Sequence, residues 1–133
     1  MPSETILEDN APLKRALEKH RLLANQLKEA TEEIGRALEK LLKDILPDIF
    51  VRAGWEESGP ETLCIFAPSH SLEKFLGKRI GKDGLVSLDT LLREEMPEIY
   101  NVECPFGVYV DREKAEEVRM RLRKLRATIG LPV

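Results

Sequence analysis

The residues whose types and spacing best suit chemistry lie in the stretch 77–84, Gly-Lys-Arg-Ile-Gly-Lys-Asp-Gly. Because glycine has no Cβ, the backbone at Gly81 and Gly84 can come close to another molecule. Amide groups at the start of a following helix can also meet an anion there. Three cations of the stretch supply matching positive charge: Lys78, Arg79 and Lys82. We therefore predict a site for phosphate groups; the alternative is a glycine-rich corner between two helices that binds nothing.

The glycine spacing Gly-x-x-x-Gly-x-x-Gly, with Ile80 before the middle glycine, resembles the signature loop of KH domains. That family uses a GxxG loop to clamp about four nucleotides of single-stranded nucleic acid. The resemblance covers residues 48–110. Two positions depart from it: Asp83 is an acid within the loop, and Ser87 stands where the family has a large aliphatic residue. The resemblance implies a nucleic-acid site, with RNA favoured, at Lys78, Arg79, Ile80, Gly81, Lys82, Asp83 and Gly84.

The resemblance also implies an apolar floor on which the bases lie. Candidates for this floor are Ile80, Val86 and residues 64–66. Trp55 could stack on a base as well, although a tryptophan at the end of a strand also packs at the rim of a core.

A second basic cluster lies near the C-terminus, within residues 119–126. On a helix, Arg119, Arg123 and Arg126 share one face, since steps of three and four residues return to the same side. If that face and the stretch 77–84 lie on one side of the domain, they form a positive groove for a phosphate backbone. We include these three arginines in the predicted nucleic-acid site. The alternative is a solvated helix surface that complements the helix dipole.

Catalytic and metal-binding patterns are not found in the sequence. It has no Gly-x-x-x-x-Gly-Lys-Ser/Thr loop, no nucleophile elbow and no zinc box. His20 and His70 have no partner at a recognisable spacing, and Cys64 and Cys104 are predicted to be buried thiols in a reduced compartment. We predict a protein without catalytic residues, metal or cofactor.

Composition limits the kind of nucleic-acid binding that is possible. Charged residues make up 34% of the 133 residues and the net charge is −3, which excludes a uniformly basic surface, so any contact must rest on a local patch. The length suits one compact domain with one extra element. The sequence contains neither a signal peptide pattern nor a run of about 20 apolar residues, and we expect a cytoplasmic protein with no membrane contact.

The element expected ahead of the domain is a long helix over residues 11–46, preceded by a flexible tail of residues 1–10. Pro12 suits its first turn and Pro47 stops it. Steps of four and three connect Leu13, Leu17, His20, Ala24, Leu27, Thr31, Ile34, Leu38, Leu41 and Ile45. This heptad pattern predicts a coiled coil and a homo-oligomer, with contacts at Leu13, Leu17, Leu27, Ile34 and Leu38. The stripe widens after Ile34, which predicts that the C-terminal half packs on the domain.

Residues 48–133 are expected to form a small α+β domain. Strands are predicted at 48–55 and 62–67, a short helix from 71, a helix over 87–96 and a last helix capped by Asp111. Residues 98–110 form either one bulged strand or two short strands around Pro105 and Gly107. The expected fold is a three-stranded sheet packed with three helices, in the order of a type II KH domain. Two strands within 98–110 would also allow the type I order, starting from residue 62.

Two hypotheses for function follow. The first is a nucleic-acid-binding accessory protein in translation, ribosome assembly or transcription, which binds single strands through the GxxG loop and dimerises by its N-terminal helix. The second is a non-enzymatic assembly or adaptor protein, whose long helix contacts the partner while the α+β part serves as a rigid head. Changes in the glycine stretch distinguish them, because only the first hypothesis needs it.

Overall fold

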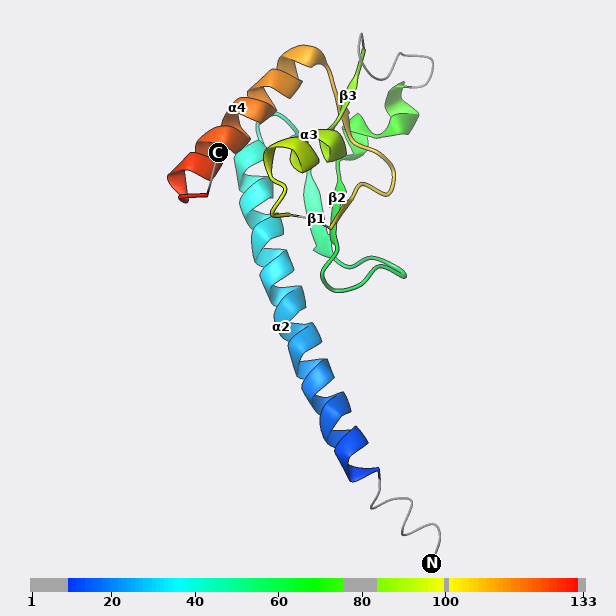
Figure 1. Cartoon of the computed structure of the whole chain (residues 1–133). Coiled ribbons are helices and arrows are strands. Elements are labelled where there is room, and N and C mark those ends of the chain that lie inside the picture. Colours follow the sequence, from blue (N-terminus) through cyan, green and yellow to red (C-terminus); the bar gives the residue numbers. More distant parts are fainter. Residues whose placement is uncertain (1–9, 76–83, 100, 132–133) are drawn as a thin grey trace, which may run out of the picture.

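A computed structural model describes residues 10–75, 84–99 and 101–131 of the chain. A long helix, α2, carries a small α+β domain at its C-terminal end and projects beyond it (Figure 1). The predicted α+β class, with a long N-terminal helix followed by a three-stranded sheet and further helices, is confirmed.

Helix α2 spans Ala11–Leu42. Pro12 lies in its first turn, where the missing N–H leaves no hydrogen bond unmade. The helix ends four residues before the predicted boundary because the chain tightens there, with the amide of Ile45 donating to the carbonyl of Leu42 at 3.1 Å. From Thr31 onward one side of α2 is buried against the domain, whereas residues 11–30 are exposed or half-buried.

Gly35 allows α2 to lie close to strand β1 (Phe50–Ala53). A Cβ atom on Gly35 would lie 2.4 Å from the Cγ2 atom of Val51 and 3.0 Å from the Cδ1 atom of Leu63. A larger residue would therefore push the helix away from the sheet.

The main sheet has three strands in the order β1-β2-β4. Strand β2 (Leu63–Phe66) pairs antiparallel with β1 and parallel with β4 (Val102–Glu103). A parallel pair needs a crossover connection. This one contains two 3-10 helices, η1 (Pro68–His70) and η2 (Leu72–Phe75), and the helix α3 (Leu88–Glu95). The helix predicted from residue 71 is thus a 3-10 helix over the residues described.

Residues 98–110 contain two short strands, the second of the two arrangements considered above. After β4 the chain turns, with the amide of Gly107 donating to the carbonyl of Cys104 at 2.8 Å. The φ of Gly107 is +74°, a value that favours glycine. Strand β5 (Tyr109–Val110) then pairs antiparallel with β3 (Val86–Ser87) in a second sheet. Strands of two residues carry no alternating pattern, so the sequence does not predict this second sheet.

Helix α4 spans Arg112–Thr128 and begins as predicted. The Asp111 carboxylate accepts a hydrogen bond from the amide of Lys114 at 2.9 Å, which caps the first turn. Its buried stripe is Ala115, Val118 and Leu122. Ile129 lies just beyond the helix and is 55% exposed.

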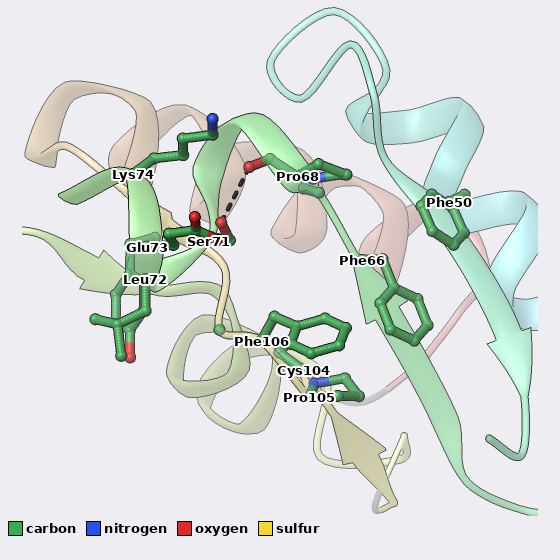
Figure 2. A pocket seen from close by; sticks show the side chains of 13 residues that line it. Phe50, Phe66, Pro68, Ser71, Leu72, Glu73, Lys74, Cys104, Pro105 and Phe106 are labelled. Carbon is green, nitrogen blue, oxygen red and sulfur yellow. Dashed lines mark hydrogen bonds between the residues drawn. The ribbon is translucent and has the colours of Figure 1, made fainter. Parts of the chain in front are cut away.

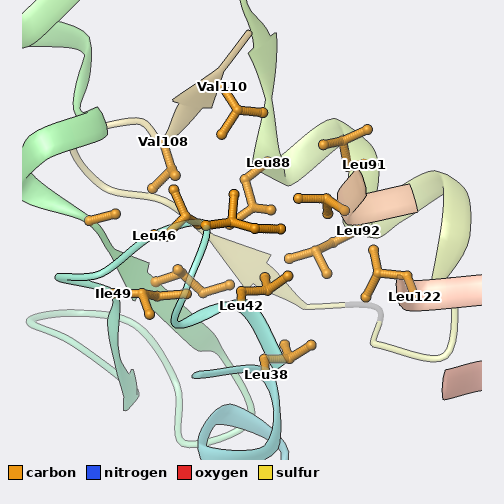
Figure 3. Close-up of a cluster of buried hydrophobic side chains, with 14 of the residues drawn as sticks. Leu38, Leu42, Leu46, Ile49, Leu88, Leu91, Leu92, Val108, Val110 and Leu122 are labelled. Carbon is orange, nitrogen blue, oxygen red and sulfur yellow. The ribbon is translucent and has the colours of Figure 1, made fainter. Parts of the chain in front are cut away.

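The hydrophobic core lies between the C-terminal half of α2, the sheet, α3 and α4 (Figure 3). Its fully buried side chains include Leu38, Leu42, Leu46, Ile49, Leu63, Ile65, Leu88, Leu91, Leu92 and Leu122. Leu38 is only 1% exposed, so the prediction that it contacts a second copy of the chain is wrong. The heptad pattern could not separate these roles, because one stripe of α2 faces the domain at one end and solvent at the other.

Candidate functional site

The glycine-rich stretch lies almost wholly outside the described residues. Of its predicted binding residues, Lys78, Arg79, Ile80, Gly81, Lys82 and Asp83 fall in the undescribed part, and Gly84 is half-buried just before β3. Both flanks are described, since η2 ends at Phe75 and β3 begins at Val86. The candidate site is therefore built from these flanks and the segments beside them.

An open groove of about 1000 Å³ lies next to the first flank (Figure 2). Val51 faces α2, and successive side chains of a strand point to opposite faces, so Phe50 and Arg52 lie on the face of the sheet away from α2. Phe50 is one of the groove residues. The full lining is Phe50, Phe66, Ala67, Pro68, Ser71, Leu72, Glu73, Lys74, Cys104, Pro105, Phe106, Gly107 and Tyr109.

Four aromatic rings cluster at this groove. The ring of Phe66 lies 4.9 Å from that of Phe50, 5.4 Å from that of Trp55 and 6.0 Å from that of Phe106, measured between ring centres. Phe66 is 6% exposed, but Phe50 and Phe106 are 36% and 60% exposed. The cluster therefore has a buried centre and two open rings, which can stack on a planar ligand.

Two hydrogen bonds fix the segments that line the groove. The carbonyl of Phe106 accepts from the amide of Leu72 at 3.1 Å, which joins the turn after β4 to η2. The hydroxyl of Ser71 donates to the carbonyl of Pro68 at 3.0 Å, which ties η2 back to η1. One backbone hydrogen bond thus ties Phe106 to the segment that leads into the glycine stretch.

The carboxylate of Asp48 holds η1 in place beside the groove. Asp48 accepts from both the amide and the hydroxyl of Ser69, each at 2.7 Å. Burial raises the pKa of Asp48, but the two bonds from Ser69 outweigh it and hold the pKa below its usual value. Burial, together with the charge of Lys114, lowers the pKa of His70, so this imidazole is neutral at neutral pH and adds no charge beside the groove.

Charges near the groove are few among the residues described. Lys74 and Glu73 line it with opposite signs. The guanidinium of Arg52 lies 5.4 Å from the centre of the Phe50 ring, a distance suited to a cation–π contact. The groove is therefore mainly apolar, with its polar groups at the rim.

The predicted arginines of α4 lie elsewhere. Arg119 bonds Glu116 at 2.6 Å, Arg123 bonds both oxygens of Glu95 at 2.9 Å, and Arg126 bonds Glu98 at 2.6 Å. The lining residues described above include none from α4, and Figure 1 shows the C-terminal part of α4 across the domain from η2. These arginines therefore do not line the groove. They form ion pairs with carboxylates of the same chain.

Phe50 and Phe106 are not among the binding residues predicted from the sequence. For Phe50 a signal was available, because alternation along β1 places it on the same face as Arg52. For Phe106 the signal was weaker: a large apolar residue between Pro105 and Gly107 sits in a turn, where exposure is common.

Within the described ranges, no group of three or more histidine, cysteine, aspartate or glutamate side chains could hold a metal ion. No helix in that same part of the chain is both long and apolar enough to cross a membrane. Comparison of the chain with models of protein families, with curated proteins and with solved structures found no match. The candidate site is therefore defined by the groove and its flanks.

Proposed function

We propose that this protein is a non-enzymatic, nucleic-acid-binding accessory protein of the cytoplasm that binds single strands, with RNA favoured. In this proposal the bases lie in the aromatic groove, and the backbone follows the glycine-rich stretch 77–84. The observation that supports this proposal is a pair of exposed rings, Phe50 and Phe106, in one groove. Residues 72–74, which also line the groove, lead directly into that stretch. The free thiols Cys64 and Cys104 suit the reducing cytoplasm.

Stacking supplies the affinity in this proposal. Every base has a flat face, and stacking on an aromatic side chain contributes about 1–3 kcal/mol per base with little dependence on sequence. Bases in a duplex already stack on each other, so an open groove of this kind favours single strands. The hairpin β1–β2 before the glycine stretch, and α3 and β4 after it, support the resemblance to KH domains, with the two-residue strand β3 as an addition between the stretch and α3.

Positive charge contributes less than in a basic protein. The arginines of α4 are engaged by carboxylates, and the net charge is −3. Cations available to the phosphates include Lys74 and Arg52 at the groove and, in the glycine stretch, Lys78, Arg79 and Lys82. Three phosphate contacts, one for each cation of the stretch, predict a slope of about −2 for log affinity against log salt on a single strand. Stacking predicts that substantial binding remains at moderate salt.

The proposal is tested by fluorescence anisotropy with a labelled single-stranded oligonucleotide, over a salt series. Phe106→Ala removes an exposed ring and should weaken binding by roughly 5- to 150-fold. Met120→Ala is the matched control, because Met120 is 63% exposed on α4 and does not line the groove. Lys82→Asp should weaken binding and flatten the salt slope. Affinity unchanged by both Phe106→Ala and Lys82→Asp would remove the proposal.

A second candidate function is assembly through α2, and the leucines exposed on its free half favour it. Leu13 and Leu17 are 55% and 60% exposed on a helix that projects from the domain. An adaptor that acts through this helix would lose its partner on Leu17→Lys and keep it on Phe106→Ala. Nucleic-acid binding through the groove predicts the opposite dependence on these two substitutions.

A further inference from the structure

Arg52 lies at the open edge of the main sheet, next to the groove. Strand β1 is the outermost of the three strands, so one of its sides faces no other strand of that sheet. The amide of Gly54 donates to the carbonyl of Thr62 at 2.8 Å, and alternate residues of an antiparallel pair bond to the partner strand. The carbonyl of Val51 therefore points to the open edge. Arg52 donates to this carbonyl at 2.9 Å, which places its guanidinium at the edge as well.

The ring of Phe50 has one face covered and the other directed to this edge. Phe66 of β2 lies opposite Phe50, with ring centres 4.9 Å apart and only 12° between the ring planes (Figure 2). The other face of Phe50 therefore points away from β2. The guanidinium carbon of Arg52 lies 5.4 Å from the centre of the same ring. A base that stacks on the open face of Phe50 therefore lies within reach of Arg52.

Arg52 keeps donors for a ligand. A guanidinium has several N–H groups in a planar fork, and the bond to the carbonyl of Val51 uses one of its nitrogens. Among the residues described, no carboxylate forms an ion pair with Arg52, whereas Arg119, Arg121 and Arg123 are all ion-paired. Arg52 is also exposed. The fork is thus held at one point, beside a ring, and is open to a second molecule.

The chemistry of this fork favours one base. Two N–H groups of an arginine match the O6 and N7 acceptors on one edge of guanine. On the corresponding edge adenine has an amino donor in place of O6, cytosine has an amino donor, and uracil has one acceptor. These edges are accessible in a single strand. An arginine beside a stacked base therefore discriminates in favour of guanine.

From this arrangement we infer that Arg52 is a specificity-determining residue, which reads the O6 and N7 edge of a guanine base stacked on Phe50. The inference rests on the proposed function, because it names the base that the groove prefers. Lysine carries the same charge but has no planar fork, so the preference should need arginine itself. A different role for Arg52 would be to shield the open edge of β1 against pairing with another chain. That role predicts no preference among bases.

Fluorescence anisotropy with short labelled RNAs tests the preference on the full chain. The reference RNA is a tract of uridines, and three others carry one guanosine, adenosine or cytidine at the centre of that tract. One bidentate pair predicts that the guanosine RNA binds roughly 5- to 150-fold more tightly than the adenosine RNA, whose purine offers a similar stacking area. Equal affinities for these two RNAs would overturn the inference, as would tightest binding of the cytidine RNA.

Two base analogues test which edge is read. Inosine keeps the O6 and N7 acceptors but lacks the amino group of guanosine, so it should bind like guanosine. The analogue 7-deazaguanosine lacks N7 and should lose most of the preference. The reverse result, with inosine weakened and 7-deazaguanosine unchanged, would mean that the Watson–Crick edge is read and would overturn the inference.

Substitution of Arg52 tests the residue itself. Arg52→Lys keeps the charge, so it should bind the uridine tract nearly as the unmodified chain does but lose the preference for guanosine. Lys74→Met is the matched control, because Lys74 lines the groove and its loss should weaken binding of all the RNAs by a similar factor. Thermal melting shows that both variants are folded. A preference for guanosine that persists in Arg52→Lys would overturn the inference.

The outcomes separate this inference from the proposed function. Dependence on Phe106 is measured with the uridine tract, which offers Arg52 no guanine to read. If Phe106→Ala weakens that binding while all four RNAs bind the unmodified chain equally, the inference is wrong and the proposed function stands. If the unmodified chain binds none of the RNAs, both are wrong.

Discussion

The rings of Phe50 and Phe66 lie 4.9 Å apart, with an angle of only 12° between their planes. The two residues are directly opposite each other in the β1–β2 pair, so the backbone ladder sets this distance. Phe66 is buried and supports Phe50, which is 36% exposed. A ring that is already held in place loses little conformational freedom on binding, which favours its use as a stacking surface.

Phe50→Leu should weaken binding of a single-stranded oligonucleotide by at least about 5-fold. Leucine keeps the apolar volume but has no ring to stack on a base, and that stacking is worth about 1–3 kcal/mol. Phe50→Tyr keeps the ring and should bind like the unmodified chain. Anisotropy titrations measure both variants, with thermal melting to show that both are folded. Equal affinities for the leucine and tyrosine variants would mean that Phe50 does not contact a base.

Arg123→Gln should leave the affinity for the oligonucleotide nearly unchanged. Arg123 is paired with Glu95 through two hydrogen bonds of 2.9 Å and does not line the groove. Its loss should lower the free energy of unfolding by less than about 1 kcal/mol, the usual range for an exposed ion pair. Lys124→Gln provides a control that removes an equal charge next to it. A large loss of affinity in Arg123→Gln, but not in Lys124→Gln, would mean that α4 is part of the binding surface.

Gly35→Ala should lower the free energy of unfolding by about 1–3 kcal/mol, although alanine is the better helix former by about 1 kcal/mol. The added methyl group would lie 2.4 Å from Val51, so α2 and β1 would have to move apart. Urea unfolding followed by circular dichroism measures the change. Asn25→Ala, at an exposed position on the same helix, should be neutral or stabilising. If both variants were stabilised, the close contact of α2 with β1 would be wrong.

The stability of the domain should fall in acid partly through Asp44. The Arg121 guanidinium bonds both of its oxygens and holds the pKa of Asp44 at about 2, below the ordinary 3.8. Because the folded pKa is the lower one, the contribution is fully present above pH 3.8 and is lost as pH falls through 2.

The urea midpoint of Asp44→Asn should therefore change less between pH 4 and pH 2 than that of the unmodified chain. Glu113→Gln removes an exposed carboxylate from α4 instead and serves as the control. Parallel pH profiles for the unmodified chain and Asp44→Asn would rule out the Asp44–Arg121 pair as a source of the acid sensitivity.

The native thiols should react slowly with a thiol reagent until the protein unfolds. Burial raises the pKa of Cys104 to about 12, from an ordinary value of 9.0, and it also raises the pKa of Cys64. Only the thiolate is nucleophilic, so a rise of this size lowers the reactive fraction of Cys104 by roughly 1000-fold. Absorbance assays at pH 8 with and without urea measure the rates, with Arg15→Cys as an exposed reference. Native rates that match Arg15→Cys would show that the thiols are accessible.

Local sequence patterns were sufficient to predict most of the helices and the two longer strands. The 3.6-residue period and Pro12 predicted the start of α2, and the carboxylate of Asp111 was correctly predicted to cap α4. Apolar runs bounded by turn residues predicted β1 and β2. These features depend on neighbours within a few residues along the chain, so they can be recognised without knowledge of the fold.

The sequence by itself determined the α+β class and the long N-terminal helix. Only the tertiary structure decided that Leu38 is buried while Leu17 is exposed on the same stripe. It also decided that Phe106 meets Phe66 and that Arg123 meets Glu95. Each of these outcomes depends on which segments, 28 or more residues apart, come together in the folded chain. Hydrophobic burial is non-directional and depends on what covers a side chain, so no local pattern could specify it.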